Sequence, residues 1–237
     1  MLDNNDNKTK TIMAIGAHTG DAQLTCGMLL ARYAMEGHRV IIADLTAGER
    51  GAPPGMAVSE FRARNVDSAR IFAECLNGES IVFDIPDGEL YPSKELELQL
   101  AGIMREKRAD IVLYHWQHSL HKDHIYAHEL SENAVFFAAL PTYEHKLPPA
   151  PVARTMMPEN WEDAEGFVPY HYYDVTGAFP LWKKAIVNLW LAEHSSSFKY
   201  LRYYEALSIC RGALINVDHA TAFAAFDYAK RVIVKEL

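Results

Sequence analysis

Apolar residues along the chain form short, strand-length runs that alternate with longer segments of helical spacing. The apolar runs predict strands at residues 10–17, 39–45, 79–85 and 110–116. Apolar side chains that recur every three or four positions predict helices at 21–36, 59–77, 94–107 and 124–139. This alternation is typical of an α/β protein with a Rossmann-like fold, in which a mostly parallel sheet carries helices on both faces.

The pattern changes after residue 140. Segment 141–180 is rich in proline and aromatic residues, and we expect long loops there with one strand near 168–175. Amphipathic spacing predicts helices over 178–213 and 220–235, which gives an aromatic-rich C-terminal region. Because no repeat or linker interrupts the pattern, we expect residues 1–237 to form a single domain.

The composition narrows the class of protein. Of the 237 residues, 49% are hydrophobic and 23% are charged, as in ordinary globular proteins. A net charge of −8 without a basic run argues against a nucleic-acid partner. A polar N-terminus and the lack of a long apolar window predict a cytoplasmic protein without a membrane span. The three cysteines are widely separated in apolar segments, so we expect core residues rather than disulfides.

Two polar clusters follow predicted strands and carry the candidate chemistry. The first is His18-Thr19-Gly20-Asp21, and the second is His121-Lys122-Asp123-His124. The carboxyl ends of parallel strands lie at one edge of a sheet, so the two clusters are expected to meet. Imidazole and carboxylate ligands suit Zn²⁺, although another divalent cation remains open. Each cluster taken alone is equally compatible with helix capping.

The clusters belong to a larger set of motifs that resembles a known family. The chain resembles the LmbE/PIG-L superfamily of zinc-dependent de-N-acetylases, which act on substrates that contain N-acetylglucosamine. The resemblance covers roughly residues 10–130 and rests, in the family's order, on Ala17-His18-Thr19-Gly20-Asp21, Leu45-Thr46-Ala47-Gly48-Glu49-Arg50-Gly51, Asp87-Gly88-Glu89-Leu90 and the His121–His124 cluster.

The resemblance implies a role for several residues. Three are expected to bind zinc and to leave one position for water: His18, Asp21 and His124. His121 is expected beside the metal, where it stabilises an oxyanion or protonates the leaving amine, with Asp123 orienting its ring. The remaining candidates are expected around the sugar: Glu49, Arg50, Arg62 and Asp87.

The first motif departs from the family at one position. The usual form is Ala-His-Pro-Asp-Asp, whose first aspartate is the general base, and this chain has Gly20 there after Thr19. Glycine cannot accept a proton. Either Glu49, Asp123 or His121 takes the role, or metal-bound hydroxide acts with weaker assistance, or the site binds a ligand without turnover. A positioned base contributes about 10²–10⁴-fold to a rate.

The leading hypothesis is a zinc-dependent hydrolase that releases acetate from an N-acetylated amino sugar or a related small conjugate. One alternative is a catalytically weak, metal-containing sugar-binding protein on the same scaffold. Another is an α/β protein whose His and Asp residues only cap helices. We expect a small-molecule substrate, a homo-oligomer, and a loop at 159–163 that shapes one wall of the pocket. His115 is either a helper at the site or an exposed loop residue.

Overall fold

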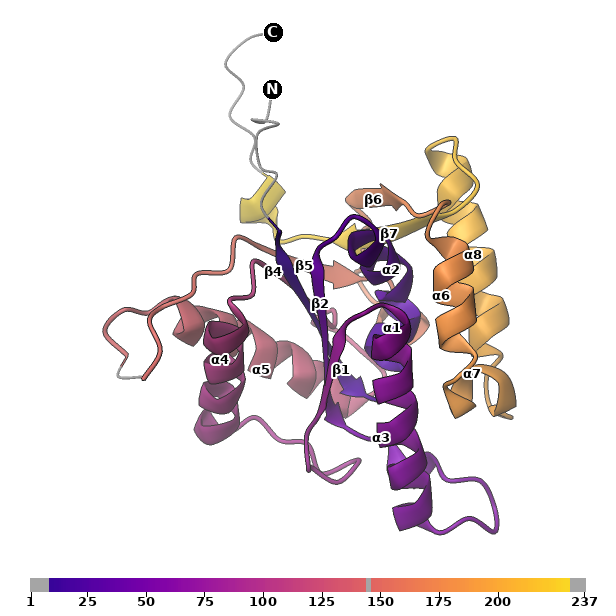
Figure 1. Cartoon of the computed structure of the whole chain (residues 1–237), viewed down its shortest axis with the longest axis horizontal. Helices are drawn as coiled ribbons and strands as arrows, with labels where there is room; N and C mark the ends of the chain where they lie inside the picture. Colours follow the sequence, from indigo (N-terminus) through magenta and orange to yellow (C-terminus); the bar gives the residue numbers. More distant parts are fainter. Residues whose placement is uncertain (1–8, 144–145, 231–237) are drawn as a thin grey trace, which may run out of the picture.

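A single sheet organises the protein, whose computed structural model describes residues 9–143 and 146–230. In this part of the chain, seven strands pair in the order β3-β2-β1-β4-β5-β7-β6 (Figure 1). Their bounds are β1 Thr11–His18, β2 Arg39–Thr46, β3 Glu79–Val82, β4 Ile111–Tyr114, β5 Arg154–Pro158, β6 His171–Asp174 and β7 Ala220–Ala224. The first five strands in this order are parallel, and β7 runs antiparallel between β5 and β6.

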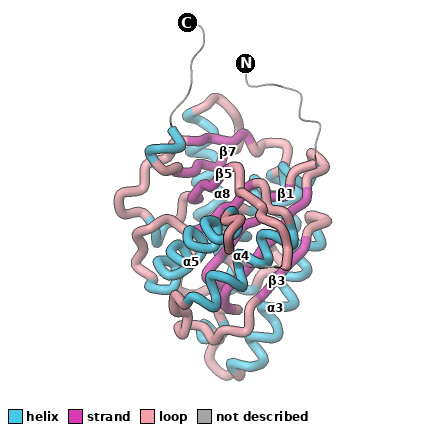
Figure 2. The backbone as a smooth tube through the Cα atoms, turned by 90° about the vertical axis from the view of Figure 1, so that its left-hand side faces the viewer, coloured by secondary structure: helices cyan, strands magenta, loops and turns pink. Residues whose placement is uncertain are grey.

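Helices cover both faces of the sheet. On one side lie α4 (Lys94–Lys107) and α5 (Lys122–Ala139), which stand in front of the strands in Figure 2. The other side carries α1 (Asp21–Thr25), α2 (Gly27–Met35), α3 (Val58–Cys75), α6 (Phe179–Ile186), α7 (Trp190–His194) and α8 (Tyr200–Leu214). None of the helices in the described ranges is both long and apolar enough to cross a membrane.

Strand β1 explains why both helical layers are needed. Its side chains alternate between the two faces, so Ile12 and Ala14 join the core under α2 and α6, whereas Met13 and Ile15 join the core under α4 and α5. All four side chains are at most 2% exposed. A strand buried on both faces is apolar throughout, which is why the sequence shows a continuous run rather than an alternation.

The predicted fold class is confirmed. Strands β1 and β2 lie within one residue of their predicted bounds, and α4 matches its predicted range. The segment 21–36 is divided at Cys26 into α1 and α2. The predicted strand near 168–175 is β6.

The prediction of a helix over 220–235 is wrong in its first part. Ala220–Ala224 forms β7, and Asp227–Lys230 forms the short 3-10 helix η3, while residues 231–235 lie outside the described residues. β7 is extended because its backbone pairs with β5 and β6. Alanine favours a helix locally, but long-range backbone pairing outweighs that preference. The same long-range pairing makes β5 a strand inside the segment expected to be looped.

Candidate metal centre

The carboxyl ends of β1, β2 and β4 bring the two polar clusters together. In the sheet, His18 at the end of β1 lies opposite Thr46 of β2, and Ile15 lies opposite Tyr114 of β4. The second cluster follows β4 and begins α5, with His121 as the N-cap residue. The resulting cleft has a volume of about 230 Å³, and its lining includes residues from both clusters.

One carboxylate oxygen lies at the centre of the site. Asp21 Oδ2 is 3.3 Å from His18 Nδ1 and 3.4 Å from His124 Nε2. Ligand atoms about 2.0–2.1 Å from a tetrahedral zinc ion are roughly 3.3–3.4 Å from one another. Both distances from Asp21 Oδ2 therefore match the spacing of two ligands of one zinc ion, and the donor atoms suit zinc. His115 Nε2 also lies 3.3 Å from Asp21 Oδ2.

His121 lies at the edge of the same group. His18, His121 and His124 each offer a nitrogen, and these three nitrogens lie within 4.8 Å of one another. The His121 ring stacks on His124 with its centroid 5.1 Å away. Burial, followed by the neighbouring His18 and His124, lowers the pKa of His121 below its ordinary value. In neutral His121 the hydrogen is on Nε2, because Nδ1 accepts a hydrogen bond from the Asp123 N–H.

The second nitrogen of His18 faces two carboxylates. His18 Nε2 lies 3.2 Å from Asp87 Oδ1 and 3.4 Å from Asp123 Oδ2. Burial by itself lowers the pKa of His18, but hydrogen bonds to Asp123 and two other carboxylates outweigh it and raise that pKa well above the usual value. A proton on Nε2 leaves Nδ1 free to act as a ligand.

Asp123 occupies a different place from the one that the resemblance implies. Its carboxylate is fully buried, contacts His18 and accepts a hydrogen bond from the Gly88 N–H at 3.0 Å. The contact with His121 is made by the Asp123 backbone N–H, which donates to His121 Nδ1 at 3.2 Å. The geometry thus connects the Asp123 carboxylate to His18 rather than to His121.

Four residues are expected around the sugar. Three of them instead hold together the loops behind the cleft. Glu49 is buried, and its carboxylate accepts from the Asp87 N–H at 2.9 Å and from Arg62 Nη1 at 3.3 Å. The side chain of Arg50 forms an ion pair with Glu89. Asp87 lines the cleft, whereas Glu49, Arg50 and Arg62 are not among its lining residues. With both oxygens engaged, Glu49 is poorly placed to act as a base.

The space beside Gly20 is occupied by a side chain from another element. Gly20 has a φ of +120°, a conformation that side chains rarely adopt. A Cβ at this position would overlap with the side chain of Leu191 from α7. Leu191 also lines the cleft. The space beside Gly20 is therefore apolar and filled, so a base must come from another element.

Glu162 is a carboxylate of the cleft that the sequence motifs do not indicate. It belongs to the 3-10 helix η2 (Trp161–Asp163), within the segment expected as a loop. Its Oε2 lies 3.6 Å from His124 Nε2. Burial raises the pKa of Glu162 above the ordinary value. Asn160 is a typical N-cap residue and would predict this turn. The segment expected to shape one wall of the pocket does contribute Glu162 to the lining of the cleft, but no motif singles out that residue.

Two further buried residues complete the site from outside the motifs. Asp163 is fully buried and lies 2.9 Å from both His115 Nδ1 and His124 Nδ1. His115 is itself 3% exposed, so it is a buried residue of the site rather than an exposed loop residue. Its Nε2 accepts a hydrogen bond from the Ala17 N–H at 3.1 Å. This bond occupies the lone pair that a metal would need, so we do not count His115 as a ligand.

Two hydrogen bonds connect the backbone of the first cluster to a buried acid, Asp44. The pKa of this acid makes the stability of the protein depend on pH. The Gly20 N–H donates to Gln23 Oε1, and Gln23 Nε2 donates to Asp44 Oδ2, both at 2.8 Å. Burial raises the pKa of Asp44 from 3.8 to about 8. The unfolded chain releases this proton near its ordinary pKa while the folded chain retains it, so stability should fall as the pH rises between these values.

We expect an Asp44→Asn variant to remove this dependence, because the amide keeps an acceptor for Gln23 and does not titrate. At pH 8 its free energy of unfolding should exceed that of the wild type by at least about 1 kcal/mol, since one pKa unit corresponds to about 1.4 kcal/mol. Urea unfolding at pH 5 and pH 8 measures the difference. Asp218→Asn, at an exposed position, is the matched control. An equal advantage of Asp44→Asn at both pH values would contradict the prediction.

Comparison with curated proteins finds two kinds of relative. A 4-oxalmesaconate hydratase from Pseudomonas putida is 25% identical over 212 residues, which cover 86% of this chain and 80% of the relative. A diacetylchitobiose deacetylase from Thermococcus kodakarensis is 29% identical over 142 residues, which cover 58% of this chain and 53% of the relative.

Solved structures with the same fold include a hydratase and a deacetylase. The 4-carboxy-2-hydroxymuconate hydratase from Pseudomonas putida has a TM-score of 0.85 at 20% identity, over 97% of this chain and 100% of that one. The N,N'-diacetylchitobiose deacetylase from Pyrococcus horikoshii has a TM-score of 0.79 at 21% identity, over 94% of this chain and 86% of that one. At these identities the similarity establishes the fold.

The match to a family model is more direct evidence of the family than the similarity to single proteins. The model described as PIG-L, GlcNAc-PI de-N-acetylase, matches residues 13–135, a span of more than half of the chain. That span runs from β1 to α5 and contains both polar clusters and the Leu45–Gly51 motif. The chain therefore belongs to the PIG-L family of GlcNAc-PI de-N-acetylases.

Proposed function

We propose that this protein is a metal-dependent hydrolase that removes the acetyl group from an N-acetylated amino sugar or a related small conjugate. The observation that carries the proposal is the position of Asp21 Oδ2, 3.3–3.4 Å from one nitrogen of His18 and one of His124. The proposed ligands are these three residues, and the proposed ion is zinc. When bound there, zinc would act as a Lewis acid toward the amide carbonyl and toward water.

The chain's own residues then have distinct proposed roles. His121 lies beside the ligands, and because its Nδ1 accepts from the Asp123 N–H, the hydrogen of the neutral ring is on Nε2, which is suited to donate to an oxyanion or to the leaving amine. Asp87 lines the cleft, where its Oδ1 faces His18 Nε2 and its Oδ2 accepts from the Arg50 N–H, so only the remaining lone pairs of this carboxylate are proposed to accept from sugar hydroxyl groups. Asp123, buried against His18, would hold the ring of that ligand.

The charge of the cleft favours an amide substrate over an anionic one. The residues that line it include three carboxylates, and no lysine or arginine is among them. The apolar part of the lining includes Phe61 and Trp190, whose rings meet edge to face at 5.2 Å. Aromatic walls suit the apolar face of a sugar ring, and carboxylates suit the ammonium product of deacetylation.

A second candidate is a hydratase, which adds water to a carbon–carbon double bond. Gly20 favours this candidate, because the site lacks the base of the usual de-N-acetylase motif. The curated hydratase also aligns with 86% of this chain. The name of the corresponding solved structure specifies a carboxylate-bearing substrate, however, and no lysine or arginine lines this cleft to pair with such a group.

We propose Glu162 as the acid–base group in place of the missing aspartate. It is half-buried in the wall of the cleft, next to His124, and Leu191 lines the same cleft. A Glu162→Gln variant should lose about 10²–10⁴-fold in kcat while keeping its zinc content, because the amide preserves shape but accepts no proton. Steady-state assays combined with elemental analysis measure both quantities.

The matched control is Glu165→Gln, an exposed carboxylate shortly after the same turn. Loss of zinc together with activity in Glu162→Gln would instead identify Glu162 as a ligand. An unchanged kcat would remove it from the chemistry.

The proposed function is tested by metal analysis of the purified protein and a screen for acetate release. The panel should contain N-acetyl sugars, and unsaturated dicarboxylates for the hydratase candidate. Zinc at one ion per chain and acetate release would support the proposal. A fully active, metal-free protein would overturn it, and sugar binding without turnover would favour the sugar-binding alternative. The homo-oligomer expected from the sequence stays a prediction.

A further inference from the structure

Asp163 links two imidazoles of the site through its two carboxylate oxygens. Its Oδ1 lies 2.9 Å from His124 Nδ1, and its Oδ2 lies 2.9 Å from His115 Nδ1. The side chain is fully buried. It comes from η2, about forty residues beyond the second cluster and outside every motif that indicates the family.

This contact determines which nitrogen of His124 is available. A carboxylate accepts hydrogen bonds and cannot donate them, so His124 Nδ1 carries a hydrogen when it faces Asp163. The lone pair of neutral His124 is then on Nε2, the atom that lies 3.4 Å from Asp21 Oδ2. Metal-binding histidines commonly depend on such a partner for their tautomer and ring orientation.

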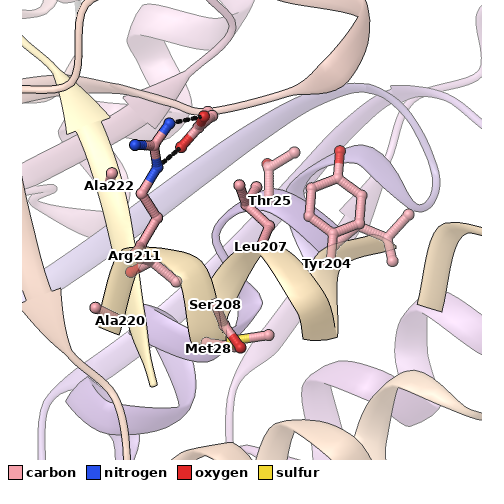
Figure 3. Close-up of a pocket in the computed structure, with 11 residues that line it drawn as sticks. Thr25, Met28, Tyr204, Leu207, Ser208, Arg211, Ala220 and Ala222 are labelled. Carbon is pink, nitrogen blue, oxygen red and sulfur yellow. Dashed lines mark hydrogen bonds and ion pairs between the residues drawn. The ribbon is translucent and has the colours of Figure 1, made fainter. Parts of the chain in front are cut away.

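The carboxylate is itself held in place by helix α8. Asn160 Nδ2 donates to Asp163 Oδ2 at 3.2 Å, and the Tyr204 hydroxyl donates to Asn160 Oδ1 at 2.8 Å. Glu159, which lies between β5 and the turn, is also fixed, because Arg211 Nε of α8 donates to Glu159 Oε2 at 2.7 Å. Figure 3 shows Tyr204 and Arg211 on the same helix, with the ion pair of Arg211 dashed. The turn that carries Asp163 is therefore anchored at two points.

We propose that Asp163 is the positioning residue of the metal centre: it fixes the tautomer and orientation of His124 and connects that ligand to α8. The inference rests on the metal site of the proposed function and not on the identity of the reaction. It assigns the C-terminal part of the chain, beyond the family match, a direct role in metal binding.

The test is zinc affinity in the folded, metal-stripped full chain. Asparagine at residue 163 offers one acceptor and one donor, so it cannot accept from both imidazoles. Asp163→Asn should therefore bind zinc about 10–100-fold more weakly than the wild type, and its Co²⁺-substituted form should show an altered visible spectrum. Glu165→Gln, which removes the same charge from an exposed position, should bind zinc like the wild type.

The outcomes separate this inference from the proposed function. If the wild type binds no zinc, the proposed function fails, whereas equal zinc affinity in the wild type and Asp163→Asn overturns the role of Asp163. A merely structural role would lower the melting temperature of the metal-free protein and leave the affinity of the folded state unchanged. If Asp163→Asn does not fold, the same measurements are made on a Tyr204→Phe variant, because this substitution removes only the hydroxyl that holds Asn160. Unchanged zinc affinity and an unchanged Co²⁺ spectrum in Tyr204→Phe would then overturn the inference.

Discussion

A His124→Ala variant should purify with little zinc and should lose hydrolysis almost completely. The substitution removes one of three proposed ligands and leaves Asp163 without one of its two imidazole partners. A Lewis acid contributes several kcal/mol to transition-state stabilisation, and each 1.4 kcal/mol is tenfold in rate, so we expect kcat/KM to fall by roughly 10³-fold or more. Elemental analysis and an acetate-release assay on the same preparation measure both effects.

His118→Ala is the matched control for this experiment, because His118 is an exposed histidine on the loop that precedes α5 and does not line the cleft. It should keep both zinc and activity. If His124→Ala retained full activity after its metal had been removed, the proposed metal centre would have no part in the reaction.

A Gly20→Asp variant should be destabilised and should not gain deacetylase activity, although it restores the family's usual residue. The position requires a φ of +120°, and the new side chain would overlap with Leu191. Backbone strain and overpacking each cost about 1–3 kcal/mol, so we expect the free energy of unfolding to fall by about 2–6 kcal/mol. Urea unfolding measures this change.

The double variant Gly20→Asp/Leu191→Ala separates sterics from chemistry. Removing the Leu191 side chain relieves the overlap and should recover part of the lost stability. Its activity is compared with that of Leu191→Ala alone, since Leu191 lines the cleft. If Glu162 is the acid–base group, the gain should stay below about tenfold. A gain that reaches the 10²–10⁴-fold range of a positioned base would instead identify a degenerate site, as the sugar-binding alternative requires.

Much of the first half of the fold could be predicted from the sequence, because its signals are local. β1 and β2 are continuous apolar runs, and such runs are buried strands wherever helices cover both faces of a sheet. The two clusters directly follow strands, so a parallel sheet brings them to one edge. The convergence of His18 and His124 on one oxygen of Asp21 follows from these local features.

The rest depends on contacts between residues far apart in the chain. Ala220–Ala224 has a helical composition and becomes β7 because β5 and β6 offer unpaired backbone groups on either side of it. The Asp123 carboxylate faces His18 because of how α5 packs against β1, and no spacing within the second cluster encodes that choice.

The sequence by itself determined the fold class, the family and the two clusters that supply the proposed ligands, because each of these follows from residues that are close together in the chain. Only the tertiary structure decided what surrounds the ligands. Leu191 fills the space beside Gly20, and Glu162 and Asp163 reach His124 from a turn anchored by α8. Such contacts arise when distant segments are buried together, and burial brings together side chains whose separation along the chain carries no pattern.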